Sequence, residues 1–463
     1  MKNRSMYGEQ TALALINFPI TDVRLNDFPE IIKALAMVKK SAALANAELG
    51  KISCSKAAAI IDVCEEIIDG SHHEHFVVDM IQGGAGTSTN MNANEVIANI
   101  ALLKLGYKKN QYHFLHPNDD VNASQSTNDV YPTSLKLAIL QSLPDLLSAQ
   151  LKLVDAFTDR AETFEGVLKV GRTQLQDAVP ITVSSEFLSF ANTISEDIQR
   201  LKEVAKLLCE INLGGTAVGT GINAPTGYSS KAIAYLKEVS GYSLTLTNDL
   251  VGASSDLGAF VAFSGILKRI SVKISKICND LRLLSSGPRA GIGEIILPTV
   301  QAGSSIMPGK VNPVIPEVVN QVAYQVIGND LTVTMAAESG QLQLNAMEPV
   351  LGYNILSSMR LLTNALEVLT TRCVNGIELD LVRCKKLLDE SLVSVIALVP
   401  EIGYEKSAEI AKEALISNKT LHEIILEKGI ISQQKLEVLF SSNNLLGNYS
   451  LSNSQNHCDS GKM

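Results

Sequence analysis

The sequence predicts a mainly α-helical protein whose centre is a bundle of long helices. Between Pro144 and Cys373, apolar residues recur every three or four positions in four long runs, as they do along the buried side of a helix. No segment alternates apolar and polar residues over a sustained length, so little β-sheet is expected. Alternating steps of three and four favour helices that pack nearly parallel, at about 20° to one another.

Each run predicts one helix. The apolar positions are Leu147, Leu151, Val154, Phe157, Ala161 and Phe164; then Phe187, Phe190, Ile194, Ile198, Leu201, Val204, Leu208 and Ile211; then Phe263, Leu267, Ile270, Ile274, Ile277, Leu281 and Leu284; and finally Ile355, Met359, Leu362, Leu366, Leu369 and Cys373. Pro144 suits the first turn of the first helix, where its missing N–H is not needed. About 25 residues of helix span roughly 37 Å, long enough for other subunits to extend the bundle. An ordinary globular helical core is the alternative.

Both ends of the chain differ from this centre. Shorter helices are expected around Phe28–Glu48 and Ser55–Asp69, and helices beyond Cys384 should be shorter and more polar. The tail from Asn443, rich in Asn and Ser, is expected to be disordered. We therefore predict a mixed, mostly helical domain at residues 1–127, a central bundle at 128–382 and a small helical domain at 383–463.

Composition excludes several classes of protein. The 463 residues include 39 Lys and Arg against 48 Asp and Glu, and charged residues make up only 19%, against about 25% in typical soluble chains. No basic cluster indicates nucleic-acid binding, and no apolar segment approaches the roughly 20 residues that span a bilayer. The start lacks the apolar core of a signal peptide, and the seven cysteines form no C-x-x-C pair. These features predict a cytoplasmic protein.

The missing charge is concentrated in five segments. These uncharged segments, interpreted as loops from their composition, are Met80–Asn94, Val121–Asn128, Thr173–Gln176, Leu213–Asn223 and Leu297–Gly309. Hydroxyls, amides and glycine-rich backbone can surround a small anion, and helix N-termini add partial positive charge. The alternative is that they are ordinary connections.

Other sites fit the sequence less well. Gly303–Lys310 resembles a phosphate-binding loop, but Ser304 stands where that pattern needs glycine and Val311 where it needs Ser or Thr. His72, His73 and His75 lack a second ligand cluster, so we assign no metal. The uncharged segments contain no histidine, which leaves hydroxyls, amides and lysine for any chemistry.

Four segments carry a family resemblance. They are Gly303–Pro313 (GSSIMPGKVNP), Gly83–Glu95, Asn118–Thr133 and Gly171–Thr182. In these the chain resembles the fumarase/aspartase superfamily, from Tyr7 to about Ser441. The resemblance implies a three-domain fold with a central five-helix domain. It also implies a homotetramer that pools these domains into a 20-helix core, with active sites formed by three subunits.

The residues of these motifs resemble the ammonia-lyase branch of that superfamily more than the fumarase branch. This implies reversible deamination of L-aspartate to fumarate and ammonia, through abstraction of a β-proton and an aci-carboxylate, with no cofactor. Gln174, where fumarases have histidine, favours the same branch. A class II fumarase acting on L-malate and an inactive scaffold of the same fold are the alternatives.

The resemblance also assigns the site residue by residue. Ser304 matches the serine that removes the β-proton. The substrate-binding residues are Thr87, Ser126, Thr127 and Ser305 at the β-carboxylate, Thr173, Lys310 and Asn312 at the α-carboxylate, Asn128 and Gln174 at the amino group, and Met307 within the same signature. Departures from the family pattern are Asp120 for a common histidine, Leu13 for an arginine, and Ser184 and Ser185 for Gly-Gln.

Overall fold

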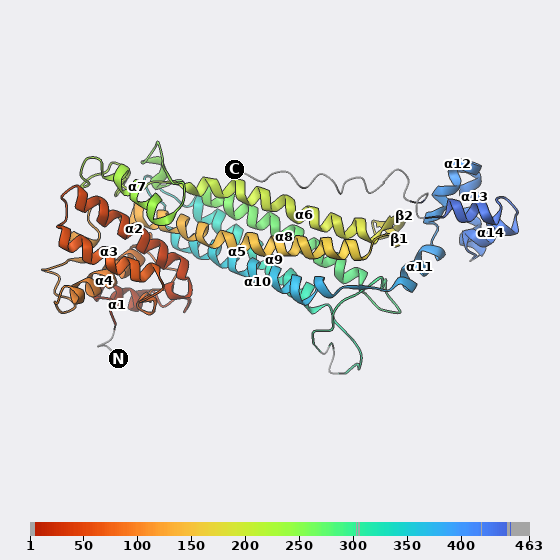
Figure 1. Cartoon of the computed structure of the whole chain (residues 1–463), viewed down its shortest axis with the longest axis horizontal. Coiled ribbons are helices and arrows are strands. Elements are labelled where there is room, and N and C mark those ends of the chain that lie inside the picture. The colour runs from red at the N-terminus through yellow and green to blue at the C-terminus, as the bar shows by residue number, and fades with distance from the viewer. Residues whose placement is uncertain (1–4, 302, 304–305, 418, 442–444, 446–463) are drawn as a thin grey trace. The chain divides into compact units, whose positions relative to one another are not determined.

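The computed structural model describes residues 5–301, 303, 306–417, 419–441 and 445. Its α-helices (Figure 1) are α1 (Glu9–Asn17), α2 (Pro29–Glu48), α3 (Cys54–Ile68), α4 (Thr87–Lys104), α5 (Thr127–Thr163), α6 (Val183–Ala205), α7 (Tyr228–Ser240), α8 (Gly258–Leu284), α9 (Val314–Glu338), α10 (Glu348–Arg372), α11 (Leu381–Glu390), α12 (Val399–Ile402), α13 (Tyr404–Ser417), α14 (Leu421–Glu427) and α15 (Gln433–Leu439). The mainly α prediction is confirmed. Among the described residues, no helix combines the length and apolarity needed to cross a membrane.

The β-structure of the described residues is limited to short pairs. The strands are β1 (Leu168–Thr173), β2 (Gln176–Thr182), β3 (Glu210–Ile211), β4 (Thr245–Leu246), β5 (Ile295–Ile296) and β6 (Glu378–Leu379). Pairs β1–β2 and β5–β6 are antiparallel, and β3–β4 is parallel. The prediction of little sheet is therefore confirmed.

The chain divides into two compact units. The first unit comprises Met1–Gln150, Glu196–Ile274 and Gln321–Ala365, and the second comprises Leu151–Ser195, Ser275–Asn320 and Leu366–Met463. Five helices of 23 to 37 residues, α5, α6, α8, α9 and α10, contribute to both units within the described part of the chain. The domain boundaries expected near residues 127 and 382 stay a prediction.

In the first unit, buried carboxylates join the long helices. Asp330 on α9 accepts hydrogen bonds from Ser264 Oγ and Lys268 Nζ on α8, at 2.8 and 2.5 Å. Asp197 on α6 pairs with Arg269 and Lys273 on α8, both at 2.8 Å. Both acids are at most 5% exposed, so these partners keep a buried charge from being left uncompensated. Helices α1–α4 and α7 pack in the same unit (Figure 1).

In the second unit, aromatic rings and an amide join the same helices. Phe157 on α5 meets Phe187 and Phe190 on α6 edge to face, with ring centroids 5.9 and 5.5 Å apart. Asn320 on α9 donates through Nδ2 to the backbone oxygen and Oγ of Ser275 on α8. The long apolar runs therefore form a helix bundle in this unit too.

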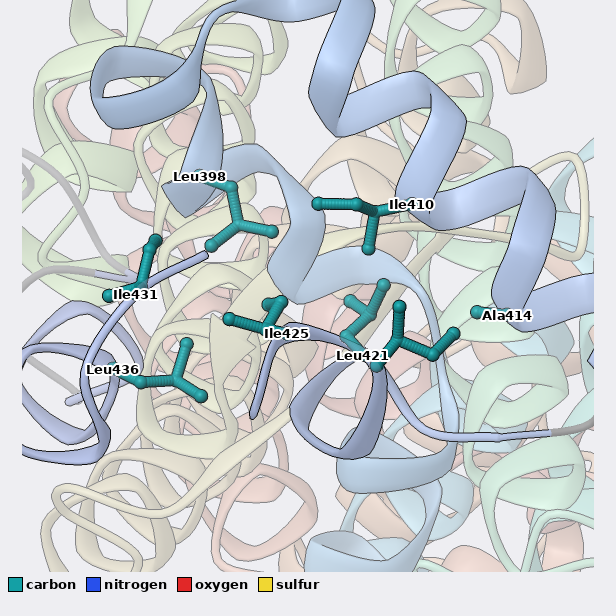
Figure 2. Close-up of a cluster of buried hydrophobic side chains, with 8 residues drawn as sticks. Leu398, Ile410, Ala414, Leu421, Ile425, Ile431 and Leu436 are labelled. Carbon is teal, nitrogen blue, oxygen red and sulfur yellow. The ribbon is translucent and has the colours of Figure 1, made fainter. Parts of the chain in front are cut away.

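A separate hydrophobic core lies among the C-terminal helices of the second unit. Figure 2 shows Leu398, Ile410, Leu421, Ile425 and Leu436 gathered there, each at most 3% exposed. Helix α14 begins with a capping box in which Thr420 and Glu423 exchange hydrogen bonds. The shorter helices predicted beyond Cys384 are confirmed. The tail expected to be disordered from Asn443 lies, except for Leu445, outside the described residues.

Two predicted helix limits are wrong. Helix α5 begins at Thr127 rather than after Pro144, which lies inside it. An interior proline costs about 3 kcal/mol, but Leu140 and Leu146 on either side of it are buried and hold this turn against the core, while Pro144 itself is exposed. The second run ends as a helix at Ala205, because Ile211 instead pairs with Leu246 in β3–β4.

Candidate active site

Two helices begin where the first group of predicted site residues lies. Thr87 is the first residue of α4, and Thr127 is the first residue of α5. Asn90 Nδ2, in the first turn of α4, donates to Thr127 Oγ1 at 3.1 Å. Because each helix N-terminus carries partial positive charge, two such termini side by side favour an anionic ligand.

The interpretation of Met80–Asn94 as a loop is wrong beyond Gly86. From Thr87 the segment is helical, and its side chains Thr89, Asn90, Asn92 and Asn94 are at most 3% exposed. Two hydrogen-bond contacts join this turn of the helix to the preceding segment: the backbone N–H of Thr89 donates to Gln82 Oε1, and the Asn92 side chain exchanges bonds with the backbone of His75 and Val77. A polar composition resembling a loop therefore forms a buried helix.

Gly86 fixes the start of α4 against α5. Its φ is 85°, and a Cβ there would lie 2.5 Å from the ring of Tyr131 on α5. Only glycine allows both this left-handed backbone and this close approach. The next residue, Thr87, begins α4 at this point.

We expect Gly86→Ala to lower the free energy of unfolding by about 2–4 kcal/mol, because the methyl group meets the Tyr131 ring in a strained backbone. Gly50→Ala is the matched control: its φ is 70°, but nothing lies within 4 Å of the added Cβ, so we expect only about 1 kcal/mol. Urea unfolding of both variants measures the difference. If both variants lose the same unfolding free energy, the contact with Tyr131 is not what makes glycine necessary at position 86.

A buried carboxylate connects two of the uncharged segments. Asp129 Oδ1 accepts from Ser126 N at 3.0 Å, and its Oδ2 accepts from Gly214 N and Thr216 N at 3.0 and 2.9 Å. Burial raises the pKa of Asp129 to about 6, against the opposite effect of these three donors. The predicted residue Asn128 adds a further connection, from Nδ2 to Ala217 O at 2.7 Å.

The two connected segments line a cavity of about 330 Å³. Its lining consists of Asn122, Ser124, Gln125, Ser126, Thr127, Thr216, Ala217, Ile222 and Asn223. None of these side chains carries a charge, and most offer hydroxyl or amide groups. Ser126 and Thr127, two of the predicted substrate-binding residues, both line this cavity, and their binding role stays a prediction. Thr216 was not among the predicted residues.

Lys39 contacts two residues that line this cavity, and it too was not among the residues predicted from the sequence. It is fully buried on α2, and its Nζ donates to Asn122 Oδ1 at 2.8 Å and Gln125 Oε1 at 3.0 Å. Asn122 Oδ1 also accepts from Asn90, so one amide connects Lys39 to both helix starts. Burial lowers the pKa of Lys39 to about 7. The available signal was a lysine at helical spacing between Leu35 and Ala42, on an otherwise apolar face.

The pKa of Lys39 predicts a pH-dependent stability. The folded state releases this proton near pH 7 and the unfolded chain only near 10.5, so wild-type stability should rise between these values. The Lys39→Met variant lacks this titration. The unfolding free energy of wild type, minus that of the variant, should therefore increase by about 1 kcal/mol per pH unit from pH 7 to 10. Guanidinium unfolding at several pH values measures it.

Lys40→Met provides the control for this measurement. Lys40 is the next residue, and its Nζ pairs with Glu65 at 2.8 Å near the surface. Its removal should leave the pH dependence of stability unchanged. Of the groups that face Lys39, Asp129 titrates below the window and Cys64, whose pKa burial raises to about 12, above it. If the difference in unfolding free energy between wild type and Lys39→Met does not change with pH, the lowered pKa of Lys39 is contradicted.

The second unit holds another group of predicted residues, at a hairpin tip. Thr173 pairs with Gln176, which leaves Gln174 and Leu175 as a two-residue turn with φ of 54° and 62°. Such a turn usually contains glycine or asparagine, so this one is strained. Buried ion pairs anchor the hairpin: Lys169 to Glu186 and Glu294 at 2.7 and 2.9 Å, and Arg172 to Glu294 at 2.9 Å.

The signature segment Gly303–Pro313 also lies in the second unit. Asn312 Nδ2 donates to Gly303 O at 2.6 Å, and a Cβ on Gly303 would lie 1.9 Å from Lys310 O, so glycine is required there. Met307 and Lys310 are exposed. The predicted base Ser304 and its neighbour Ser305 lie outside the described residues.

Two departures from the family pattern have local partners. Asp120, in place of a histidine, accepts from Lys56 Nζ through both oxygens at 2.8 Å. Ser185 contacts Thr182 through the two hydroxyls, 2.6 Å apart, at the start of α6. For His72, His73 and His75, no group of three metal-binding side chains occurs among the residues with described positions.

Comparison with known families identifies two matching models. The family model described as Lyase matches residues 1–328, and the one described as Fumarase C C-terminus matches residues 395–447. The aspartate ammonia-lyase of Pseudomonas aeruginosa is 55% identical over 441 residues, covering 95% of this chain and 93% of the relative. That of Escherichia coli K12 is 50% identical over 441 residues, with 95% and 92% covered.

Solved structures agree with these sequence matches. The fumarate lyase:delta crystallin from Brucella melitensis bound to cobalt superimposes with a TM-score of 0.93 at 58% identity, covering 96% of this chain and 95% of the other. The class II fumarase from Schistosoma mansoni has a TM-score of 0.89 at 32% identity, with 96% of both chains covered.

Proposed function

Because the chain belongs to the lyase family, we propose that it catalyses the reversible deamination of L-aspartate to fumarate and ammonia. This makes it a carbon–nitrogen lyase. The observation that carries the proposal is identity of 50–55%, over nearly the whole chain, to relatives named aspartate ammonia-lyase. The similarity to a class II fumarase is lower, at 32%, which makes L-malate the second candidate substrate.

Purified protein mixed with L-aspartate should generate the ultraviolet absorbance of fumarate, and ammonia in equal amount. L-Malate should give a signal at least 100-fold weaker. A strong signal from L-malate with none from L-aspartate would replace the proposed reaction by the fumarase reaction. Absence of product from both would indicate the inactive scaffold.

In the proposed mechanism, Ser304 is the base. Removing the β-proton places two negative charges on one carboxyl group, which forms an aci-carboxylate. Donors aimed at that developing charge are worth about 3 kcal/mol each, by analogy with oxyanion holes. Thr87, Ser126, Thr127 and Ser305 would supply these donors. The two helix N-termini at Thr87 and Thr127 support this assignment, since both favour negative charge.

The remaining assigned residues would hold the other end of the substrate. Thr173, Lys310 and Asn312 would bind the α-carboxylate, Asn128 and Gln174 would meet the amino group, and Met307 would lie against the substrate. After the β-proton leaves, the C–N bond breaks and its electron pair departs with the amine as ammonia. The proposed steps need no cofactor.

We further propose that four copies of the chain assemble into a cytoplasmic tetramer with a 20-helix core, in which three subunits form each active site. The outward face of α9 supports association. From Val318 to Ala337 the only charged residue is Asp330, which is buried and bonded to α8. On the opposite face Tyr324, Leu331 and Met335 are 60–63% exposed. An uncharged helix face that exposes three large apolar side chains suits a second copy of the same helix.

A further inference from the structure

We propose that Thr216 is an additional substrate-binding residue, whose hydroxyl donates to the carboxylate that Ser126 and Thr127 hold. This inference rests on the proposed dicarboxylate chemistry and adds a residue to that site. Thr216 comes from the glycine-rich segment Leu213–Asn223, roughly 90 residues from the other two along the chain. All three side chains line the same 330 Å³ cavity.

The backbone of Thr216 is strained. Its φ is 57°, a left-handed conformation that a β-branched residue rarely adopts. In the same segment Gly214, Gly219 and Gly221 also have positive φ, so glycine is the residue that suits this loop. A threonine in such a position is kept at a cost to stability, and such costs are concentrated at functional sites.

The hydroxyl of Thr216 also lowers the stability of the folded state. The residue is only 4% exposed, and among the residues that the structure describes Oγ1 has no hydrogen-bond partner. A buried hydroxyl without a partner costs about 1–3 kcal/mol. Strain and an unsatisfied hydroxyl at one residue do not favour folding, but they are explained if the hydroxyl serves a ligand in the cavity.

Asp129 sets the distance between Thr216 and Ser126. Its two carboxylate oxygens accept from the backbone N–H of both residues, at 2.9 and 3.0 Å. Those two bonds fix both backbones without using either side-chain hydroxyl. Three residues that carry a hydroxyl, Ser126, Thr127 and Thr216, therefore line one cavity, with no charged lining side chain to repel an anion. A carboxylate accepts several such donors at once.

The test compares Thr216→Val with Thr216→Ser. Valine keeps the shape and β-branching of threonine but removes the hydroxyl, while serine keeps the hydroxyl. We expect Thr216→Val to lower kcat/KM for L-aspartate by about 10- to 100-fold, mainly through kcat, because charge on the carboxylate rises in the transition state. Thr216→Ser should stay within about fivefold of wild type.

Thermal stability separates a binding role from a structural one. Since valine removes an unsatisfied hydroxyl, Thr216→Val should melt at the same temperature as wild type or higher. A kcat/KM within twofold of wild type, or a loss of activity accompanied by a lower melting temperature, would overturn the inference. Wild-type turnover tests the proposed reaction independently: if only L-malate is converted, the same ratios measured with L-malate still test Thr216.

Discussion

Replacing Ser304 with alanine is expected to lower kcat for L-aspartate by about 10³- to 10⁴-fold, because the variant lacks the proposed base for the β-proton. The proton is weakly acidic, so water cannot substitute efficiently for a positioned alkoxide. KM should change little, since the α- and β-carboxylates keep the groups assigned to them. Steady-state kinetics followed by fumarate absorbance, with enzyme at high concentration, measures the loss.

Ser305→Ala is the matched control, because Ser305 is the next residue in the same segment and is assigned to carboxylate binding. Its loss should remain in the range of about 10- to 100-fold, as for one donor among several. Sedimentation of both variants should match that of wild type. Near-normal turnover of Ser304→Ala, or an equal loss in both variants, would remove Ser304 as the base.

Leu331→Asp is expected to dissociate the assembly and abolish at least 99% of activity. The substitution places a carboxylate in the middle of the exposed α9 face, and burying an unpaired charge between helices costs several kcal/mol at every contact. If each active site needs residues from three subunits, dissociated chains have no complete site. Sedimentation velocity measures the assembly, and fumarate absorbance measures the activity.

Leu103→Asp serves as the control for this experiment. Leu103 lies on α4 and is 45% exposed, so it presents a comparable leucine away from the α9 face. This variant should sediment and react like wild type. A Leu331→Asp protein that keeps wild-type size contradicts the proposed role of the α9 face. One that dissociates but keeps wild-type turnover contradicts shared sites.

Helix α9 shows where prediction of the fold from the sequence stops. The runs through α6, α8 and α10 have one apolar stripe each, and their periodicity predicts these helices. In α9, apolar residues occur on the buried face, as at Val326 and Val333, and on the exposed face, as at Tyr324 and Leu331. Because apolar residues lie on both faces, no single apolar stripe marks this helix, and it could not be recognised from spacing alone.

The candidate site was predictable to a similar extent. Composition marked Val121–Asn128 as one of the uncharged segments, and two of its residues, Ser126 and Thr127, line one cavity. Their substrate-binding roles come from the family resemblance and stay a prediction. Composition does not reveal which buried groups hold these residues in place. Lys39 and Asp129 act through contacts between segments 83 to 87 residues apart, which only the folded chain brings together.

The way Asp129 holds the cavity has a consequence for redesign of the enzyme. Its carboxylate accepts hydrogen bonds from the main-chain N–H groups of Ser126 and Thr216. The side chains at these two positions can therefore be exchanged without removing the bonds that hold their backbones. Libraries that vary these two positions should therefore yield folded proteins at high frequency. Such libraries can be screened for variants that accept substrates with other acidic groups. Replacing Asp129, in contrast, would remove the hydrogen bonds to both segments at once.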